Sequence, residues 1–236
     1  MTEAQARTLV LLTGEQEKPH FETFLKRQNP ALDVVFCTSL IELSCVVEQR
    51  AGRVRLIAFL TDLIVPKSIL RQLIFTPYNI HPGPPEYPGS HPESFAIWDS
   101  AHRYGVTAHE MTERVDEGPI VLLDTFDMPA LPERGILADQ TYARAVNLFS
   151  VLGAHCAAHD SDLPRLPVSW LGLKRTKADF QRLCMPPAGL LPTEQARLKR
   201  ACGEALIALQ APDRHQNADL VAFQTDMLLF LRGAAV

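Results

Sequence analysis

The sequence predicts an α/β protein with an open, mostly parallel β-sheet and flanking helices. Strand-like and helix-like segments alternate through the first half of the chain, which is the pattern of parallel strands joined by helices. The strand-like segments are short and continuously apolar, as in strands that are buried on both faces. The chain has 236 residues, of which 47% are hydrophobic and 21% charged, so it is long enough to bury a sizeable core.

In the first half, short apolar runs mark the predicted strands and helices, and the residues between these runs mark where each element ends. The run LVLLT stops at Gly14, and the apolar residues of KPHFETFLKRQ recur at helical spacing until Asn29 and Pro30 end the helix. Pro66 suits the first turn of a later helix because its ring fixes a helical backbone angle. We expect strands at residues 9–13, Asp33–Cys37, 56–60 and Tyr78–His81, and helices at residues 18–28, Leu40–Gln49 and 66–73.

The second half begins with a helix whose start carries two signals. Ser90 and Glu93 have the Ser-x-x-Glu spacing of a capping box, and Pro92 suits the first helical turn. The composition changes after a proline-containing linker, so we expect residues 1–165 to form one domain and residues 166–236 a small α+β extension. The further expected elements are strands at residues 104–111 and 119–124, helices at residues 139–158 and 193–200, and two strands within residues 205–231.

Composition and charge argue against several classes of partner. A net charge of −4 with 23 Lys and Arg residues argues against nucleic acid, which needs clustered basic side chains. The longest apolar runs are much shorter than a membrane span, and the N-terminal MTEAQARTLV lacks the features of a signal peptide. We therefore expect no membrane partner and a cytoplasmic location. The five cysteines are widely spaced and include no CxxC pair, which predicts no metal site.

Prolines are concentrated between Pro77 and Pro92, directly after a strand that carries polar side chains. Asn79 and His81 alternate on that strand, so both point to the same side of the sheet, at the end where open α/β sheets bind ligands. Asp116 lies in a loop between two strand-like runs, from which a carboxylate can reach a histidine. These groups suit proton transfer and oxyanion stabilisation. On spacing alone, the alternative is that Asn79 caps the end of a strand, His81 is a surface histidine and Asp116 makes a turn.

Four sequence blocks occur in order around these residues. They are Asn79-Ile80-His81-Pro82, Tyr87-Pro88-Gly89, Gly105-Val106-Thr107-Ala108-His109 and Asp116-Glu117-Gly118-Pro119-Ile120. The blocks resemble the 10-formyltetrahydrofolate-dependent formyltransferase family, which includes methionyl-tRNA, glycinamide ribonucleotide and sugar formyltransferases. The resemblance covers residues 9–126 and fades after residue 152. It implies a Rossmann-like formyltransferase fold and a catalytic function for residues 1–165.

The resemblance also implies catalytic roles for Asn79, His81 and Asp116. A substrate amine would attack the formyl carbon of 10-formyltetrahydrofolate while Asn79 hydrogen-bonds the carbonyl oxygen. His81 would take the proton of the amine and pass it to the folate nitrogen, and Asp116 would hold His81 and an ordered water. The family uses no metal, so we expect none here, and we expect His109 to be a supporting or strand-packing residue.

The expected donor site and substrate loop also follow from the resemblance. In the family, the pterin lies between the segment before a helix and the loop that carries the aspartate. Apolar residues there suit an aromatic ring, although Ile64 and Val65 could equally be ordinary core residues at a strand end. Pro84, Pro85 and Tyr87 stand in the loop that contacts substrate or cofactor in relatives. The residues expected to bind the donor are Leu63, Ile64, Val65, Glu113, Val115 and Asp116.

Two departures from the family pattern bear on the acceptor. The loop after His81 lacks the usual Ser-Leu-Leu-Pro, and Pro88 stands where relatives have the arginine of Tyr-Arg-Gly. Together with the acidic charge, they favour a small amine, such as an amino sugar or a hydroxylated ornithine, over a tRNA. The alternatives are a hydrolase of the same donor and a non-catalytic folate-binding protein. The apolar residues 220–223 and 228–231 are expected to pack on the core or to form the contact of a homodimer.

Overall fold

A computed structural model describes residues 8–186 and 189–206 of the chain, which form a β-sheet with flanking helices. Its strands are β1 (Thr8–Leu12), β2 (Asp33–Cys37), β3 (Val54–Phe59), β4 (Tyr78–His81), β5 (Arg103–Glu110) and β6 (Ile120–Asp127). They form one six-stranded sheet in the order β2-β1-β3-β4-β5-β6. The pairs from β2 to β4 are parallel, whereas β5 is antiparallel to both β4 and β6. The prediction of an open, mostly parallel sheet is confirmed.

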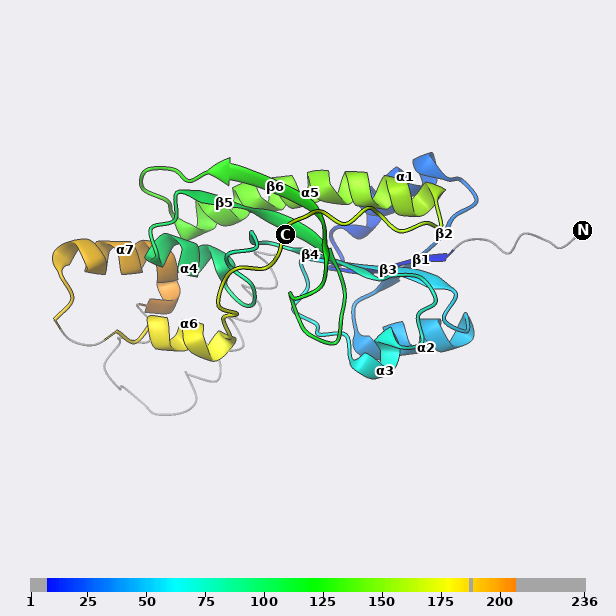
Figure 1. Cartoon of the computed structure of the whole chain (residues 1–236), viewed down its shortest axis with the longest axis horizontal. Coiled ribbons are helices and arrows are strands. Elements are labelled where there is room, and N and C mark those ends of the chain that lie inside the picture. Colours follow the sequence, from blue (N-terminus) through cyan, green and yellow to red (C-terminus); the bar gives the residue numbers. More distant parts are fainter. Residues whose placement is uncertain (1–7, 187–188, 207–236) are drawn as a thin grey trace, which may run out of the picture.

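Helices cover both faces of this sheet (Figure 1). They are α1 (Lys18–Gln28), α2 (Leu40–Gln49), α3 (Lys67–Leu70), α4 (Pro92–Trp98), α5 (Arg134–Ala158), α6 (Lys177–Leu183) and α7 (Pro192–Cys202). The helices α1 and α5 lie on one face, and α2 and α3 lie on the other. The remaining helices, α4, α6 and α7, gather at the left end of the molecule in Figure 1 and share a small core of their own.

The two faces of the sheet explain the continuous apolar runs in its central strands. Leu9 of β1 packs in one core with Phe21 of α1 and Phe149 of α5, whose rings stack with centroids 3.7 Å apart. Its neighbour Val10 packs in the second core with Leu43 of α2. Because side chains alternate along a strand, a strand that is covered on both faces must be apolar at every position.

The elements differ from expectation mainly at helix ends. Helix α5 begins at Arg134 and not at Asp139, and α3 is a single turn. Helix α6 has no counterpart in the prediction, although Thr176 and Asp179 form a capping box at its start. The structure does not describe residues 207–236. The two strands expected within residues 205–231 therefore lie outside the described residues, apart from positions 205 and 206.

The capping box predicted at the start of α4 is wrong. The N-cap is His91, which has a left-handed backbone with a φ of 55° and makes no side-chain cap hydrogen bond. Glu93 pairs instead with Arg134 of α5, with 3.0 Å between Oε1 and Nε. A charge-assisted contact between two partly buried groups is stronger than a neutral cap, which explains why the glutamate turns away from the helix start. Pro92 does occupy the first turn, as predicted.

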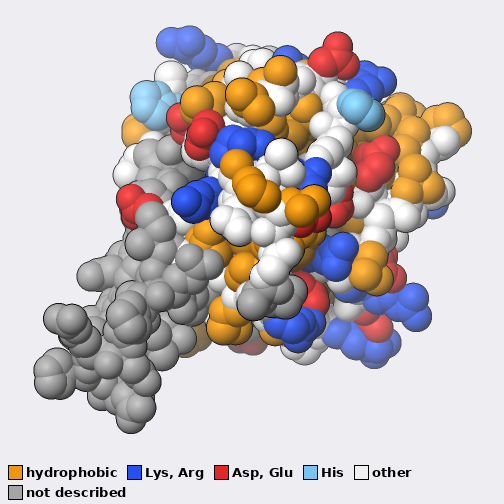
Figure 2. All heavy atoms as spheres, turned by 90° about the vertical axis from the view of Figure 1, so that its left-hand side faces the viewer, with side chains coloured by type: hydrophobic (Ala, Val, Ile, Leu, Met, Phe, Trp, Pro, Cys, Tyr) orange, Lys and Arg blue, Asp and Glu red, His pale blue; other side chains and the backbone are white. Residues whose placement is uncertain are grey.

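The surface of the molecule is mixed in character where α4, α6 and α7 meet. Figure 2 looks onto this end and shows basic, acidic and hydrophobic side chains interspersed. Across residues 8–186 and 189–206, none of the helices combines the length and the apolar character needed to cross a lipid bilayer.

Candidate active site

Strand β4 presents its side chains alternately to the two faces of the sheet. Tyr78 and Ile80 are buried in the core with α5, so Asn79 and His81 point to the other face. In the antiparallel register with β5, Asn79 lies opposite His109, where the β5–β6 pairing is irregular. Such irregularities re-aim side chains and are common beside active sites. The strand pairing therefore brings one amide and two imidazoles onto the same side of the sheet.

The loop between β5 and β6 brings the Asp116 carboxylate to both imidazoles. Its Oδ2 lies 3.5 Å from Nδ1 of His81, and its Oδ1 lies 3.3 Å from Nε2 of His109. The backbone N–H of Gly89 donates to the same Oδ2 at 2.9 Å. Asp116 has a left-handed backbone, with a φ of 50°, which aspartate tolerates and which often occurs at functional sites. Asn79, His81 and Asp116, predicted from the sequence, thus meet in space.

His81 is 4% exposed, and each of its ring nitrogens faces a partner. Nε2 lies 2.9 Å from the carbonyl oxygen of Tyr87, which can only accept, so Nε2 carries the hydrogen. In the neutral ring, Nδ1 therefore holds the lone pair, on the side of Asp116. A proton accepted at Nδ1 would lie beside the carboxylate, which stabilises the imidazolium.

Asp116 stays ionised although it is buried. Burial by itself would raise the pKa of the carboxyl, but the charge of His81, the hydrogen bond and charge of His109 and the N–H of Gly89 together hold this pKa well below its usual value. The carboxylate is therefore a lasting counter-charge for a protonated His81.

His109 connects Asn79 to Asp116. Its Nδ1 donates to the carbonyl oxygen of Glu110 at 2.9 Å. Its Nε2 lies 3.1 Å from Nδ2 of Asn79, so a neutral ring accepts from the amide, whereas a protonated ring donates to the carboxylate of Asp116. The amide nitrogen has two hydrogens, so Asn79 can hold His109 with one and donate the other to a developing oxyanion.

The two segments expected to bind the donor lie side by side. Lys67 at the start of α3 forms an ion pair with Glu113 in the β5–β6 loop, with 2.5 Å between Nζ and Oε2. Ile64, in the segment before α3, is 65% exposed, and Val115, in the loop, is 38% exposed. These two side chains therefore have apolar surface free to contact a ring.

Five other predicted residues are more covered. Leu63 and Val65 pack against the core beneath α2 and α3. Val65 is buried, as an ordinary core residue at a strand end would be. Pro84 and Pro85 are also buried, so their side chains support the loop. Tyr87 is half-buried, and burial together with the negative charges of Asp99 and Glu86 raises the pKa of its phenol to about 12.

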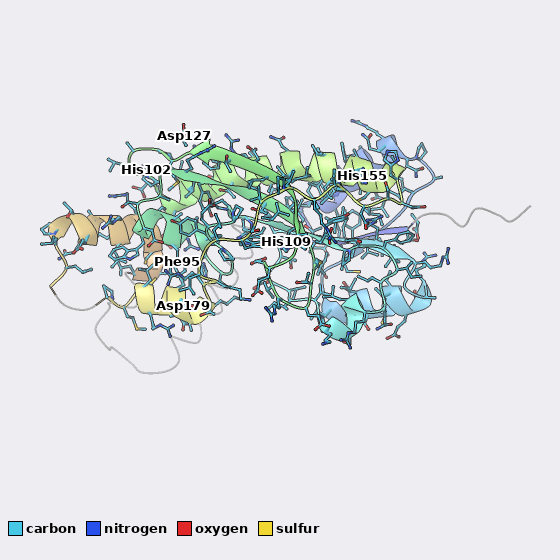
Figure 3. The ribbon with its side chains drawn as sticks, in the orientation of Figure 1. Phe95, His102, His109, Asp127, His155 and Asp179 are labelled. Atoms are coloured by element: carbon cyan, nitrogen blue, oxygen red, sulfur yellow. The ribbon has the colours of Figure 1, made fainter. Side chains whose placement is uncertain are left out.

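A segment between α5 and α6 also contacts the site, and we call its residues 166–176 the strap. The ring centroid of Trp170 lies 5.7 Å from that of His81 and 5.1 Å from that of His109, in edge-to-face contacts. Figure 3 shows His109 near the centre of the molecule, where the strap crosses the sheet. Trp170 lies beyond the domain boundary expected at residue 165, and that boundary stays a prediction.

Metal-binding groups do not gather in the part of the chain that the structure describes. None of its clusters combines three or more His, Cys, Asp or Glu side chains in a way that could hold a metal ion. The five cysteines are all free, and four of them are buried like small hydrophobic residues.

A family comparison covers the segment that holds this cluster. Residues 42–142, which include Asn79, His81, His109 and Asp116, match the model of the formyl transferase family. This segment is less than half of the chain, and over it the chain is similar to the formyl transferase family. The match supports a transferase enzyme. No curated protein sequence matches the chain.

Solved structures of formyltransferases share the fold of this chain. A sugar N-formyltransferase from Shewanella sp. is 17% identical with a TM-score of 0.68, covering 82% of this chain and 87% of that one. A 4-N formyltransferase from Francisella tularensis is 16% identical with a TM-score of 0.63, covering 83% and 87%. An N-formyltransferase from Helicobacter canadensis, in complex with folinic acid and dTDP-3-aminofucose, is 13% identical with a TM-score of 0.61, covering 84% and 81%. At these identities, the likeness shows the fold alone.

Two residues outside the predicted catalytic set also contact the candidate site. His109, expected to be a supporting or strand-packing residue, contacts both Asn79 and Asp116. Its place in the Gly-Val-Thr-x-His block is the signal that could have identified it. Trp170 has no comparable signal, since only the path of the strap brings it to the imidazoles.

Proposed function

We propose that the protein transfers a formyl group from 10-formyltetrahydrofolate to the amine of a small molecule, such as an amino sugar. The observation that carries this proposal is the cluster of Asn79, His81 and Asp116 within residues 42–142, which match the formyl transferase family. The Helicobacter canadensis N-formyltransferase, whose structure contains folinic acid and dTDP-3-aminofucose, supports a folate donor and an amino-sugar acceptor through its similar fold.

Asn79 has the chemistry to stabilise the tetrahedral intermediate. When the amine nitrogen attacks the formyl carbon, the carbonyl oxygen gains negative charge. The second hydrogen of the Asn79 amide can donate to that oxygen while the first is held by His109. His109 therefore orients the amide before the charge develops, which lowers the cost of reorganising it during the reaction.

His81 and Asp116 provide the route for the proton. The attacking amine gives its proton to Nδ1 of His81, which faces Asp116 and carries no hydrogen in the neutral ring when Nε2 donates to Tyr87. The same proton then passes to N10 of the folate as the carbon–nitrogen bond to the formyl group breaks. Asp116, held ionised by its neighbours, stabilises the protonated imidazole between these two transfers.

The donor would bind between the segment before α3 and the β5–β6 loop. Ile64 and Val115 offer apolar surface on either side, which suits the aromatic pterin. The ion pair between Lys67 and Glu113 holds the two segments together at this place. Asp116 belongs to the same loop, so the donor site and the catalytic carboxylate share one short stretch of chain.

The test is a transfer assay with a panel of amines, including amino sugars on nucleotide carriers and hydroxylated ornithine. Purified protein is incubated with 10-formyltetrahydrofolate and each amine, and the formylated product is measured by mass spectrometry. We expect one amine class to be formylated. We expect His81→Ala to lose this activity while keeping folate binding and thermal unfolding, and Asp116→Ala to lose it while still folding. Rapid release of tetrahydrofolate and formate without any amine would indicate a hydrolase, and folate binding without turnover would indicate a binding protein.

A further inference from the structure

We propose that Trp170, carried by the strap, shields the reacting formyl group from water, so that the group passes to the amine and is not lost by hydrolysis. This inference rests on the proposed function. It assigns Trp170 a part in choosing the nucleophile, outside the segment of the chain that matches the family model.

The strap is attached to the loop that carries Asp116. The indole Nε1 of Trp170 donates to the carbonyl oxygen of Gly118 at 2.8 Å, two residues after the carboxylate. Nζ of Lys174 lies 2.7 Å from a carboxylate oxygen of Glu117 in the same loop. The backbone of Gly118 packs directly against that of Glu110, because a Cβ on Gly118 would lie 1.8 Å from the carbonyl oxygen of Glu110. Trp170 is therefore held against a point of the site that has little freedom to move.

The strap is also attached to the proline-rich loop on the other side of His81. The backbone N–H of Leu171 donates to the carbonyl oxygen of Pro85 at 3.0 Å, and that of Arg175 donates to Pro88 at 3.0 Å. In return, the N–H of Ser90 donates to the carbonyl oxygen of Arg175 at 2.9 Å. The strap thus joins the two loops that flank the catalytic imidazole.

Two glycines allow the strap to lie directly on the proline-rich loop. A Cβ on Gly172 would lie 1.7 Å from the carbonyl oxygen of Glu86, and a Cβ on Gly89 would lie 2.1 Å from that of Arg175. Gly89 also has a φ of +94°, which other residues rarely adopt. Backbones this close leave no room for a layer of water between them.

The indole of Trp170 covers the two imidazoles. Its edge-to-face contacts reach both His81 and His109, which are only 4% and 2% exposed, whereas Asn79 keeps partial exposure. The ring is half-buried, so it stands between the site and solvent. The catalytic groups are thereby shielded beneath Trp170, while the amide that would bind the formyl oxygen remains reachable.

Shielding has a chemical consequence because water and the amine compete for the same carbon. Attack by the amine forms a new carbon–nitrogen bond, breaks the bond to N10 and yields a formylated amine and tetrahydrofolate. Attack by water forms a carbon–oxygen bond, breaks the same bond and yields formate and tetrahydrofolate. Asn79 and His81 would assist both reactions equally, so the access of water decides the partition.

The test measures the ratio of formate to formylated amine for each donor consumed. Trp170→Ala is compared with the wild type and with Leu173→Ala, a control on the same strap whose side chain is 72% exposed. We expect Trp170→Ala to raise the ratio about tenfold and Leu173→Ala to leave it unchanged. The ratio does not depend on how much protein is folded, so a merely structural role of Trp170 would lower both products together and leave the ratio unaltered.

Trp170→Phe keeps the inference testable if the alanine variant does not fold. It retains an aromatic ring but loses the hydrogen bond to Gly118, so we expect a rise of about twofold. An unchanged ratio in a folded variant overturns the inference while the proposed function stands. A wild type that formylates no amine overturns the proposed function itself.

Discussion

Gly83→Ala tests how tightly the loop after β4 holds His81, the proposed carrier of the proton. Gly83 lies close to the imidazole of His81, and a Cβ at this position would meet three neighbours. It would lie 2.6 Å from Nε2 of His81, 2.8 Å from Cβ of Pro92 and 3.0 Å from the carbonyl oxygen of Tyr87. Two of these are parts of the hydrogen bond that assigns the proton to Nε2.

The expected size of the effect follows from these distances. Ordinary contacts of a Cβ begin near 3.4 Å, so the imidazole of His81 and the new methyl must separate by 0.8 Å (3.4 − 2.6). Neither the proline ring nor the loop backbone can give way easily, so the imidazole must move. A displacement near 1 Å in a catalytic group can cost about 100-fold in rate, and overpacking typically costs about 1–3 kcal/mol of stability.

The assay compares kcat/KM for formyl transfer and the free energy of unfolding for Gly83→Ala and Gly135→Ala. Gly135 lies in α5 and has no atom within 4 Å of its Cβ position, so its variant should keep full activity and gain up to about 1 kcal/mol. We expect Gly83→Ala to lose about 100-fold in kcat/KM while still folding. Wild-type activity in Gly83→Ala would refute the placement of His81 as the group that moves the proton.

Two further perturbations test the charge and the packing described here. Asp116→Asn should lower kcat/KM by about 10²–10⁴, because the protonated His81 loses its counter-charge. The folded state lowers the pKa of Asp116, so its contribution to stability is complete above the unfolded pKa and is lost as pH falls toward the folded one. The difference in unfolding free energy between wild type and Asp116→Asn, measured in urea, should therefore be constant near neutral pH and shrink below about pH 4; a difference that grew on acidification would contradict the lowered pKa. Phe149→Ala removes a 1% exposed ring stacked on Phe21 and should cost about 3–5 kcal/mol by chemical denaturation, and a cost under 1 kcal/mol would contradict the described core.

Local patterns were enough to predict the fold class and the position of the strand that carries Asn79 and His81. The continuous apolar runs of β1 and β3 reflect burial on both faces, which any such strand must show. The alternation of Asn79 and His81 placed both on one side because the period of a strand is two. These features depend on neighbours in the chain, so a sequence contains them directly.

The remaining features of the site depend on contacts between distant segments. His109 faces Asn79 only because β5 runs antiparallel to β4 in one particular register. Trp170 reaches the imidazoles only because the strap is held by backbone carbonyls of two loops, and any residue type has such groups. Likewise, Glu93 does not cap its own helix but pairs with Arg134, which lies 41 residues later in the chain. None of these choices is determined by a local pattern.

The most direct test of the central claim follows the fate of the formyl group in one reaction. Wild type and His81→Ala are each mixed with 10-formyltetrahydrofolate and the accepted amine, and formylated amine and formate are quantified together by mass spectrometry. The proposed chemistry predicts that the wild type places nearly all formyl groups on the amine, and that folded His81→Ala places almost none. Formate as the main wild-type product, or undiminished transfer by His81→Ala, would contradict it.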